Sequence, residues 1–263
     1  MIDELPMPLY VGGHASVVLD DGPSLVVAAP AHHPLRVPLA RCSRLVLRLS
    51  TNVGDGVLAA CVRQRIPVFW LNGAGQAYAC CLPCAPEAQK DTEIVREALA
   101  RADWKEAYDA WKLAQRRLAL LALARRFGFD IAGWRNHAWL CSLMHRCGIR
   151  RAWGLWAIGQ WRGLLVSLIR QHWSDHGKPV AHTYSLQHGW DLAADVASWV
   201  ALDMIIDLYH RRAHWGRVRA APRKQVDIAL IQALEQRKKR LLKLADDSGR
   251  RFNTWLLDFI TCP

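Results

Sequence analysis

Residues 185–198, SLQHGWDLAADVAS, combine one histidine, two aspartates and a serine at spacings of three, four and three. On a helix these spacings place His188, Asp191, Asp195 and Ser198 on one stripe. An imidazole beside carboxylates is a donor set for a divalent cation such as Mg²⁺ or Mn²⁺. The competing interpretation is structural: a buried or capping histidine, and acids that favour a helix start through its dipole. These residues alone leave both interpretations open.

A second group of potential metal ligands is CCLPC, which contains Cys80, Cys81 and Cys84. Its thiolates would suit zinc, but no further Cys/His pair follows at zinc-finger spacing. The N-terminal segment lacks the pattern of a secretory signal, and no apolar run reaches the ~20 residues of a membrane span. We therefore expect a cytoplasmic protein whose cysteines are small reduced thiols.

The elements that must position these side chains form two regions. Residues 1–85 read as β-rich: HASVVLDDGPSLVVAA has two β-branched runs around a turn and predicts a hairpin, and CSRLVLRLS predicts a strand. Between two strands, TNVGDGVLAACVRQR predicts a short helix that Thr51 or Asn52 can cap. Residues 91–263 have helical periodicity throughout. The fold class predicted from these patterns is α+β.

Breaks in the helical region are predicted from glycine, proline and loss of periodicity. A long helix ends at Gly128 and breaks near residues 102–103, and a later helix ends at Gly177. The stretch that carries His188 starts a helix that runs to about Arg212. Two further helices are predicted over QVDIALIQALEQRKKRLLKLA and GRRFNTWLLDFI.

Composition indicates a folded, basic protein. Of 263 residues, 52% are hydrophobic and 22% charged, which excludes a disordered chain and permits one large domain or two modest ones. The formal net charge is +12, but residues 1–90 hold 7 Lys/Arg and 6 Asp/Glu, so the excess lies in the helical region. Such an excess predicts an anionic partner such as nucleic acid. The alternative is that arginine only keeps a tryptophan-rich helical surface soluble.

Lysine and arginine side chains that neutralise phosphates dominate binding to DNA. Residues 235–243 form a further basic segment, for which the alternative interpretation is a solvated charged helix face. The tryptophans near Arg150, Arg151 and Arg162 could stack on bases, but tryptophans at helical spacing are more often core or interface residues. The predicted DNA contacts are Arg150, Arg151, Arg162, Arg211, Arg212, Arg217, Arg219, Arg223 and Lys224.

The stretch VPLARCSRLVLRLSTNVGDGVLAACVRQRIPVFWLNGAGQAYACCLP resembles the N-terminal β-domain of the CRISPR adaptation integrases, the Cas1 family. The resemblance implies a β-rich dimerisation domain over residues 1–85 and a helical DNA-binding, catalytic-type domain over residues 91–263. It also implies a homodimer that takes part in spacer acquisition. The matching positions are Val37–Leu39, Leu45–Leu47, Ser50, Thr51, Leu58, Cys61, Ile66–Leu71 and Gly75.

In that family a glutamate on one helix, a later histidine and a D-x-x-D/E pair hold Mg²⁺ or Mn²⁺ for phosphoryl transfer. The resemblance places His188 at the histidine and Asp195 at the first acid. Gly159 stands at the glutamate, Ser198 at the second acid, and Asp203 at a further aspartate. Loss of two carboxylates weakens a site for hard cations. The resemblance therefore implies a remnant metal site and a member that is weakly catalytic or non-catalytic.

Three interpretations of function remain open. In the first, a degenerate Cas1-like protein binds double-stranded or branched prespacer DNA, with a Cas2-type subunit or an active paralogue as further candidate partners. In the second, His188, Asp195 and Asp191 form a rebuilt site, with Gln160 as a neutral ligand, and the protein is an active metal-dependent integrase or nuclease. In the third, it is a protein-interaction subunit without a DNA role. The cofactor expected from the family is Mg²⁺ or Mn²⁺; the first interpretation also allows none.

Overall fold

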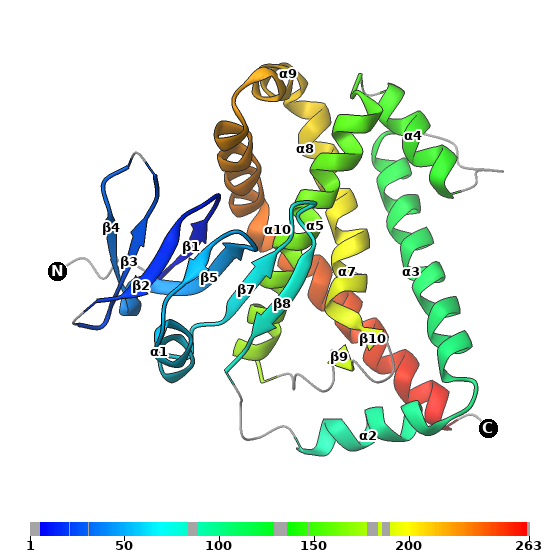
Figure 1. The fold of residues 1–263 in the computed structure, drawn as a ribbon. Coiled ribbons are helices and arrows are strands. Elements are labelled where there is room, and N and C mark those ends of the chain that lie inside the picture. The colour runs from blue at the N-terminus through cyan, green and yellow to red at the C-terminus, as the bar shows by residue number, and fades with distance from the viewer. Residues whose placement is uncertain are drawn as a thin grey trace.

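The structure, a computed structural model, describes residues 6–20, 22–30, 32–83, 89–128, 136–146, 148–177, 184–185 and 190–261. Strands occupy the chain up to residue 81 and helices most of the rest, which confirms the predicted α+β class (Figure 1). The strands are β1 (Met7–Val11), β2 (Ser16–Leu19), β3 (Ser24–Ala28), β4 (Leu35–Pro38), β5 (Cys42–Arg48), β6 (Asn52–Val53), β7 (Val68–Leu71), β8 (Ala77–Cys81), β9 (Tyr184–Ser185) and β10 (Trp190–Asp191). The helices are α1 (Val57–Arg63), α2 (Gln89–Ala100), α3 (Trp104–Arg126), α4 (Asn136–Arg146), α5 (Arg151–Asp175), α7 (Leu192–Val200), α8 (Met204–His210), α9 (Arg212–Ala220) and α10 (Arg223–Thr261), with 3₁₀ turns η1 (Leu39–Arg41) and η2 (Ala201–Asp203).

The N-terminal region consists of two four-stranded sheets, with strand orders β4-β3-β2-β6 and β1-β5-β7-β8. The predicted hairpin is confirmed as β2 and β3, which pair antiparallel with Val17 opposite Val27. In the second sheet β5 lies parallel to both β1 and β7, while β8 returns antiparallel to β7. Helix α1 provides the crossover between the parallel strands β5 and β7, because parallel neighbours cannot be joined by a tight turn.

The second sheet is covered on both faces. Leu45 and Leu47 of β5 are fully buried in the core shared with the other sheet, whereas Val46 between them packs into the core of the helical region. Alternate residues of a strand point to opposite faces, so β5 joins the two cores. Figure 1 shows this sheet lying between the first sheet and helices α5 and α10.

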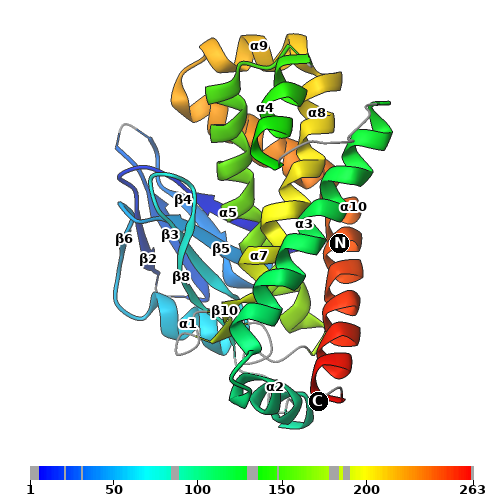
Figure 2. The ribbon, with the colours of Figure 1, turned by 90° about the vertical axis from the view of Figure 1, so that its right-hand side faces the viewer.

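Helix α5 is the centre of the helical region. Every residue from Gly163 to Arg170 is buried, which means that neighbours surround this part of the helix on all sides. Helix α7 packs against it, and α3 and α10 flank α7 on the outside, as Figure 2 shows. Much of the tryptophan content fills this core: Trp104 and Trp111 of α3 pack against Trp255 of α10 at ring-centroid distances of 5.6 and 5.7 Å. Among the described residues no helix is both long and apolar enough to cross a membrane.

Several predicted boundaries are confirmed and others are wrong. The break near residues 102–103 is confirmed, since α2 ends at Ala100 and α3 begins at Trp104. The helix cap at Thr51 or Asn52 is wrong, because Asn52 pairs in β6 and α1 begins after Gly56, whose φ is +77°. The single helix from the His188 stretch to Arg212 is also wrong: it starts at Leu192 and is interrupted at η2 and after His210. The two C-terminal helices are one continuous helix, α10, because a single interior glycine costs only about 1 kcal/mol.

Candidate functional site

Asp191 lies at the start of α7, where its carboxylate binds two groups. Its Oδ1 accepts the backbone N–H of Ala194 at 3.0 Å, which makes Asp191 the N-cap of the helix. Its Oδ2 accepts a hydrogen bond from Nη2 of Arg170 on α5 at 2.6 Å, and the Arg170 side chain is only 8% exposed. The other terminal nitrogen of Arg170 lies 2.8 Å from Sγ of Cys80 on β8. Asp191 thus caps a helix and neutralises a buried cation.

Asp195 lies one turn further along α7, facing α3. Its Oδ2 accepts a hydrogen bond from the hydroxyl of Tyr108 at 2.8 Å, and Nζ of Lys112 lies 4.0 Å away. Burial raises the pKa of Asp195, and so does the charge of Asp191; the Tyr108 hydrogen bond and the charges of Lys112 and Arg162 lower it without reversing the shift. The net result is a carboxyl group whose pKa lies above its ordinary value.

Ser198 and Gly159, which stand where the Cas1 family has acids, make other contacts in this structure. Ser198 donates its hydroxyl to the carbonyl of Asp195 at 2.6 Å, one turn back on the same helix. Gly159 lies on the face of α5 that meets the turn between β7 and β8, where a Cβ would have only the carbonyl oxygen of Ala74 within 4.0 Å. Gln160 donates to that same carbonyl at 2.6 Å and accepts from Arg48 at 3.1 Å.

The described members of the predicted donor set are bound by other protein groups or lie apart from one another. Gln160 is ten residues from Arg170 on α5, about 15 Å along the axis, so the amide is distant from the Asp191 carboxylate that Arg170 binds. Each of the two aspartates already binds donors from the protein, and in the part of the chain that the structure describes no three His, Cys, Asp or Glu side chains are grouped as metal ligands. His188 lies outside the described residues. Whether His188 and Asp195 bind metal stays a prediction.

Asp203 illustrates a role that the sequence did not indicate. Its carboxylate accepts hydrogen bonds from Arg237 at 2.5 Å and from Arg240 at 2.8 Å, both on α10. Burial alone would raise the pKa of Asp203, but the hydrogen bonds and charges of the two arginines outweigh it and hold the pKa below its ordinary value. Asp203 therefore ties η2 to α10, and two arginines of the basic segment 235–243 serve an internal ion pair.

Asp203 and Asp195 are expected to differ in how much stability is lost when each is replaced by asparagine. Asp203→Asn should destabilise the protein by about 2 kcal/mol at neutral pH, because the partly buried Arg237 and the more exposed Arg240 both lose their carboxylate. A depressed folded-state pKa stabilises above the unfolded pKa, so this loss should vanish as pH falls through and below about 4.

Asp195→Asn is the matched control. An asparagine oxygen can still accept from Tyr108, and the variant removes a charge that burial disfavours, so stability should stay within about 1 kcal/mol of wild type or rise. Urea unfolding of both variants at neutral and acid pH measures the difference. Equal losses for both variants would contradict the separate roles assigned to the two acids.

The basic residues predicted to contact DNA lie mostly at one end of the helical region, around α9 (Figure 1). Trp153 and Trp161 of α5 pack against Trp215 of α9 at 5.7 and 5.5 Å, which brings the starts of these helices together. Arg223 lies over the ring of Trp156, 4.3 Å from its centroid. The set at this end is Arg150, Arg151, Arg211, Arg212, Arg217, Arg219, Arg223 and Lys224, whereas Arg162 lies closer to Asp195 and lowers its pKa.

Comparison with solved structures defines the class of fold. No protein-family model and no curated protein matches this sequence. A Cas1 protein from Thermotoga maritima matches over 97% of both chains, with a TM-score of 0.68 and 9% identity. TtCas1 in a DNA complex matches over 97% of this chain and 91% of its own, with a TM-score of 0.51 and 16% identity. A casposase bound to an integration product matches over 80% and 74%, with a TM-score of 0.55 and 11% identity. The chain therefore has the Cas1 fold over nearly its whole length, as the sequence resemblance predicted.

Proposed function

We propose that this protein acts in CRISPR adaptation as a Cas1-like subunit that binds prespacer DNA and has weak or no catalytic activity of its own. The observation that carries the proposal is the match to Cas1 structures along almost the whole chain, one of them in a DNA complex. A basic end of exposed arginines, built on the packed tryptophans of α5 and α9, supports binding to duplex or branched DNA.

The weak-activity part of the proposal rests on the donor set. Gly159 and Ser198 offer no carboxylates, Asp191 binds Arg170, and Asp195 accepts from Tyr108. A hard divalent cation prefers several oxygen ligands, and here it would share Asp191 with a guanidinium and Asp195 with a hydroxyl. Bound Mg²⁺ or Mn²⁺ would supply charge stabilisation for phosphoryl transfer. The rival proposal, an active enzyme using His188, Asp191 and Asp195, requires that sharing.

The residues 1–85 are proposed to pair two subunits. Exposed apolar side chains support this role: Met7 is 69% exposed, Leu35 56% and Leu49 48%, although single exposed apolar residues are common. A Cas2-type subunit is a candidate partner, because one matched structure is a Cas6-RT-Cas1–Cas2 complex. That match covers 98% of this chain and 36% of the other, at a TM-score of 0.60.

One experiment tests binding and chemistry together. Labelled branched DNA is titrated with protein at several salt concentrations, and strand transfer is then assayed with Mn²⁺. We expect the affinity for DNA to fall steeply as the salt concentration rises. In Arg217→Ala or Arg219→Ala the slope of the logarithm of the binding constant against the logarithm of the salt concentration should be smaller in magnitude by about 0.9, because each variant removes one cation that neutralises a phosphate. Strand transfer should stay near background.

Two results would overturn parts of this proposal. Robust transfer that disappears in Asp195→Ala would establish the active metal-dependent enzyme. Absent DNA binding, or binding that ignores salt, would favour the interaction subunit without a DNA role.

A further inference from the structure

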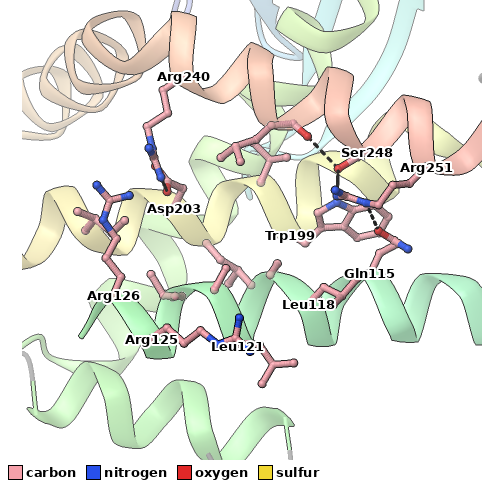
Figure 3. Close-up of a pocket in the computed structure, with 17 residues that line it drawn as sticks. Gln115, Leu118, Leu121, Arg125, Arg126, Trp199, Asp203, Arg240, Ser248 and Arg251 are labelled. Atoms are coloured by element: carbon pink, nitrogen blue, oxygen red, sulfur yellow. Dashed lines mark hydrogen bonds and ion pairs between the residues drawn. The ribbon is translucent and has the colours of Figure 1, made fainter. Parts of the chain in front are cut away.

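A cavity of about 480 Å³ lies between α3, the α7–η2–α8 segment and α10, away from the β-sheets (Figure 3). Its size falls within the range of pockets that bind small organic ligands, roughly 300–1,000 Å³. The second half of α3 forms one wall, from Gln115 to Arg126. The other walls come from residues 199–206 and from Arg240 to Arg251 of α10.

The charge of this cavity is strongly positive. Four arginines line it, Arg125, Arg126, Arg240 and Arg251, against one carboxylate among the described lining residues, that of Asp203. That carboxylate is already bound by Arg240 and by Arg237 outside the cavity. In Figure 3, Arg126 and Arg240 point toward Asp203 from opposite walls.

The end of the cavity opposite Asp203 holds one charged side chain, Arg251, among neutral polar groups. Arg251 donates from Nε to Gln115 at 2.7 Å and from Nη2 to Ser248 at 3.1 Å, and neither partner cancels its charge. Trp199 donates its indole N–H to the same Ser248 hydroxyl at 3.1 Å. Gln115, Ser248 and Arg251 therefore form a connected polar group on α3 and α10 (Figure 3).

Between the two ends the lining is apolar. Leu118 is 49% exposed, an unusual exposure for a large apolar side chain that lies in a cavity wall. Trp199, Leu202, Ile206 and Leu244 complete this middle section. A ligand complementary to the cavity has an anionic group at one end, a flat apolar body, and hydrogen-bonding atoms at the other end.

We propose that this cavity binds a nucleotide. The phosphate would lie at the guanidinium of Arg126, which can donate a pair of hydrogen bonds, and at Nη1 of Arg240, since Nε and Nη2 of Arg240 bind Asp203. The base would lie against Leu118 and present its polar edge to Gln115 and Arg251, since a carboxamide offers both a donor and an acceptor. A free mononucleotide and the unpaired end of a DNA strand share this chemistry.

This inference deepens the proposed function. If the nucleotide is the end of a DNA strand, the inference rests on that function; if it is a free mononucleotide, it does not. The cavity lining shares no residue with the basic set around α9. Loss of dAMP binding with unchanged affinity for blunt duplex DNA would therefore concern the cavity alone, and the two proposals can fail independently.

The test is calorimetric titration of the full chain with dAMP, with adenosine and with inorganic phosphate. We expect dAMP to bind at least tenfold more tightly than either fragment. Arg126→Gln and Arg251→Gln should each weaken dAMP binding at least tenfold. Arg117→Gln and Arg250→Gln remove the same charge from the same two helices at exposed positions outside the cavity, so these controls should bind dAMP like wild type.

A second arm distinguishes the two sources. Affinity for a duplex with a single-stranded tail is compared with affinity for the blunt duplex, in wild type and in Arg126→Gln. If the tail raises the affinity of wild type but not of Arg126→Gln, the cavity binds a DNA end. If wild type binds dAMP but the tail does not raise its affinity for the duplex, the cavity binds a free nucleotide. Absent dAMP binding by folded wild-type protein, or equal weakening in the controls and the cavity variants, overturns the proposal. Urea unfolding of each variant verifies that it is folded.

Discussion

Replacing Arg44 with alanine is expected to cost about 3–5 kcal/mol of folding stability, the range found when one partner of a buried ion pair is removed. The Arg44 side chain on β5 is 0% exposed, and its Nη2 lies 2.7 Å from Oε1 of Glu235 on α10. Nη2 also donates to the Tyr10 hydroxyl at 2.6 Å, and Nη1 donates to Gln171 of α5 at 3.1 Å. One guanidinium therefore connects the second sheet to α5 and α10, and alanine would leave the carboxylate without its cation.

The matched control is Arg36→Ala in the same β-rich region. Arg36 pairs with Asp20 at 2.6 Å, but its side chain is 63% exposed, and exposed ion pairs contribute about 1 kcal/mol or less. Urea unfolding of both variants measures the contrast. In the double variant Arg44→Met/Glu235→Leu the loss should be smaller than in Arg44→Ala, because no carboxylate is left unpaired. A loss below about 1 kcal/mol in Arg44→Ala would contradict the role of this residue as a buried connection.

Arg44 also shows which part of the fold the sequence could not predict. The strand predicted over CSRLVLRLS is confirmed as β5. Its surroundings could not be predicted from that pattern: β5 is buried on both sides, and Arg44 finds its partner 191 residues along the chain. Local patterns predicted the β2–β3 hairpin and the α2–α3 break, because those features depend on neighbouring residues.

In the candidate site, too, the features that depend on neighbouring residues could be predicted and those that depend on distant contacts could not. The acids at 191 and 195 could be singled out by spacing alone, and the start of α7 at Leu192 follows from Asp191 as a cap. Their partners could not be predicted from spacing, since Tyr108 is 87 residues from Asp195 and Arg170 is 21 residues from Asp191. Those tertiary contacts determine whether a carboxylate is available to a ligand, and only the fold provides them.

Gly163→Ala is expected to destabilise the protein, although alanine usually stabilises a helix relative to glycine. A Cβ at position 163 of α5 would overlap the carbonyl oxygen of Gly75 and lie 2.7 Å from its carbonyl carbon, both backbone atoms in the β7–β8 turn. No side chain can rotate away to make room, so the turn or the helix must shift. Overpacking of this kind costs about 1–3 kcal/mol and can cost more when backbone must move.

Gly75, on the other side of this contact, limits how far the β7–β8 turn can move to accommodate a larger residue at position 163. Gly75 has a φ of +79°, and its own Cβ position would lie 2.5 Å from the Gln160 side chain, so the turn is already pressed against α5. Gly216→Ala in α9 is the control: that glycine is exposed, no described residue outside its own helical turn lies within 4 Å of its Cβ position, and alanine should stabilise by up to about 1 kcal/mol.

Urea unfolding compares the two glycine variants, and hydrogen exchange of the Asn72–Gln76 backbone amides locates the damage. Gly163→Ala should lower stability by at least about 2 kcal/mol and accelerate exchange in that turn, where the N–H of Gly75 donates to Asn72 at 2.9 Å. If Gly163→Ala were as stable as wild type, α5 could not lie this close to the β-sheet. This contact and the hydrogen bonds of Arg44 both join the second sheet to α5, and they help to fix how the β-rich region lies on the helices.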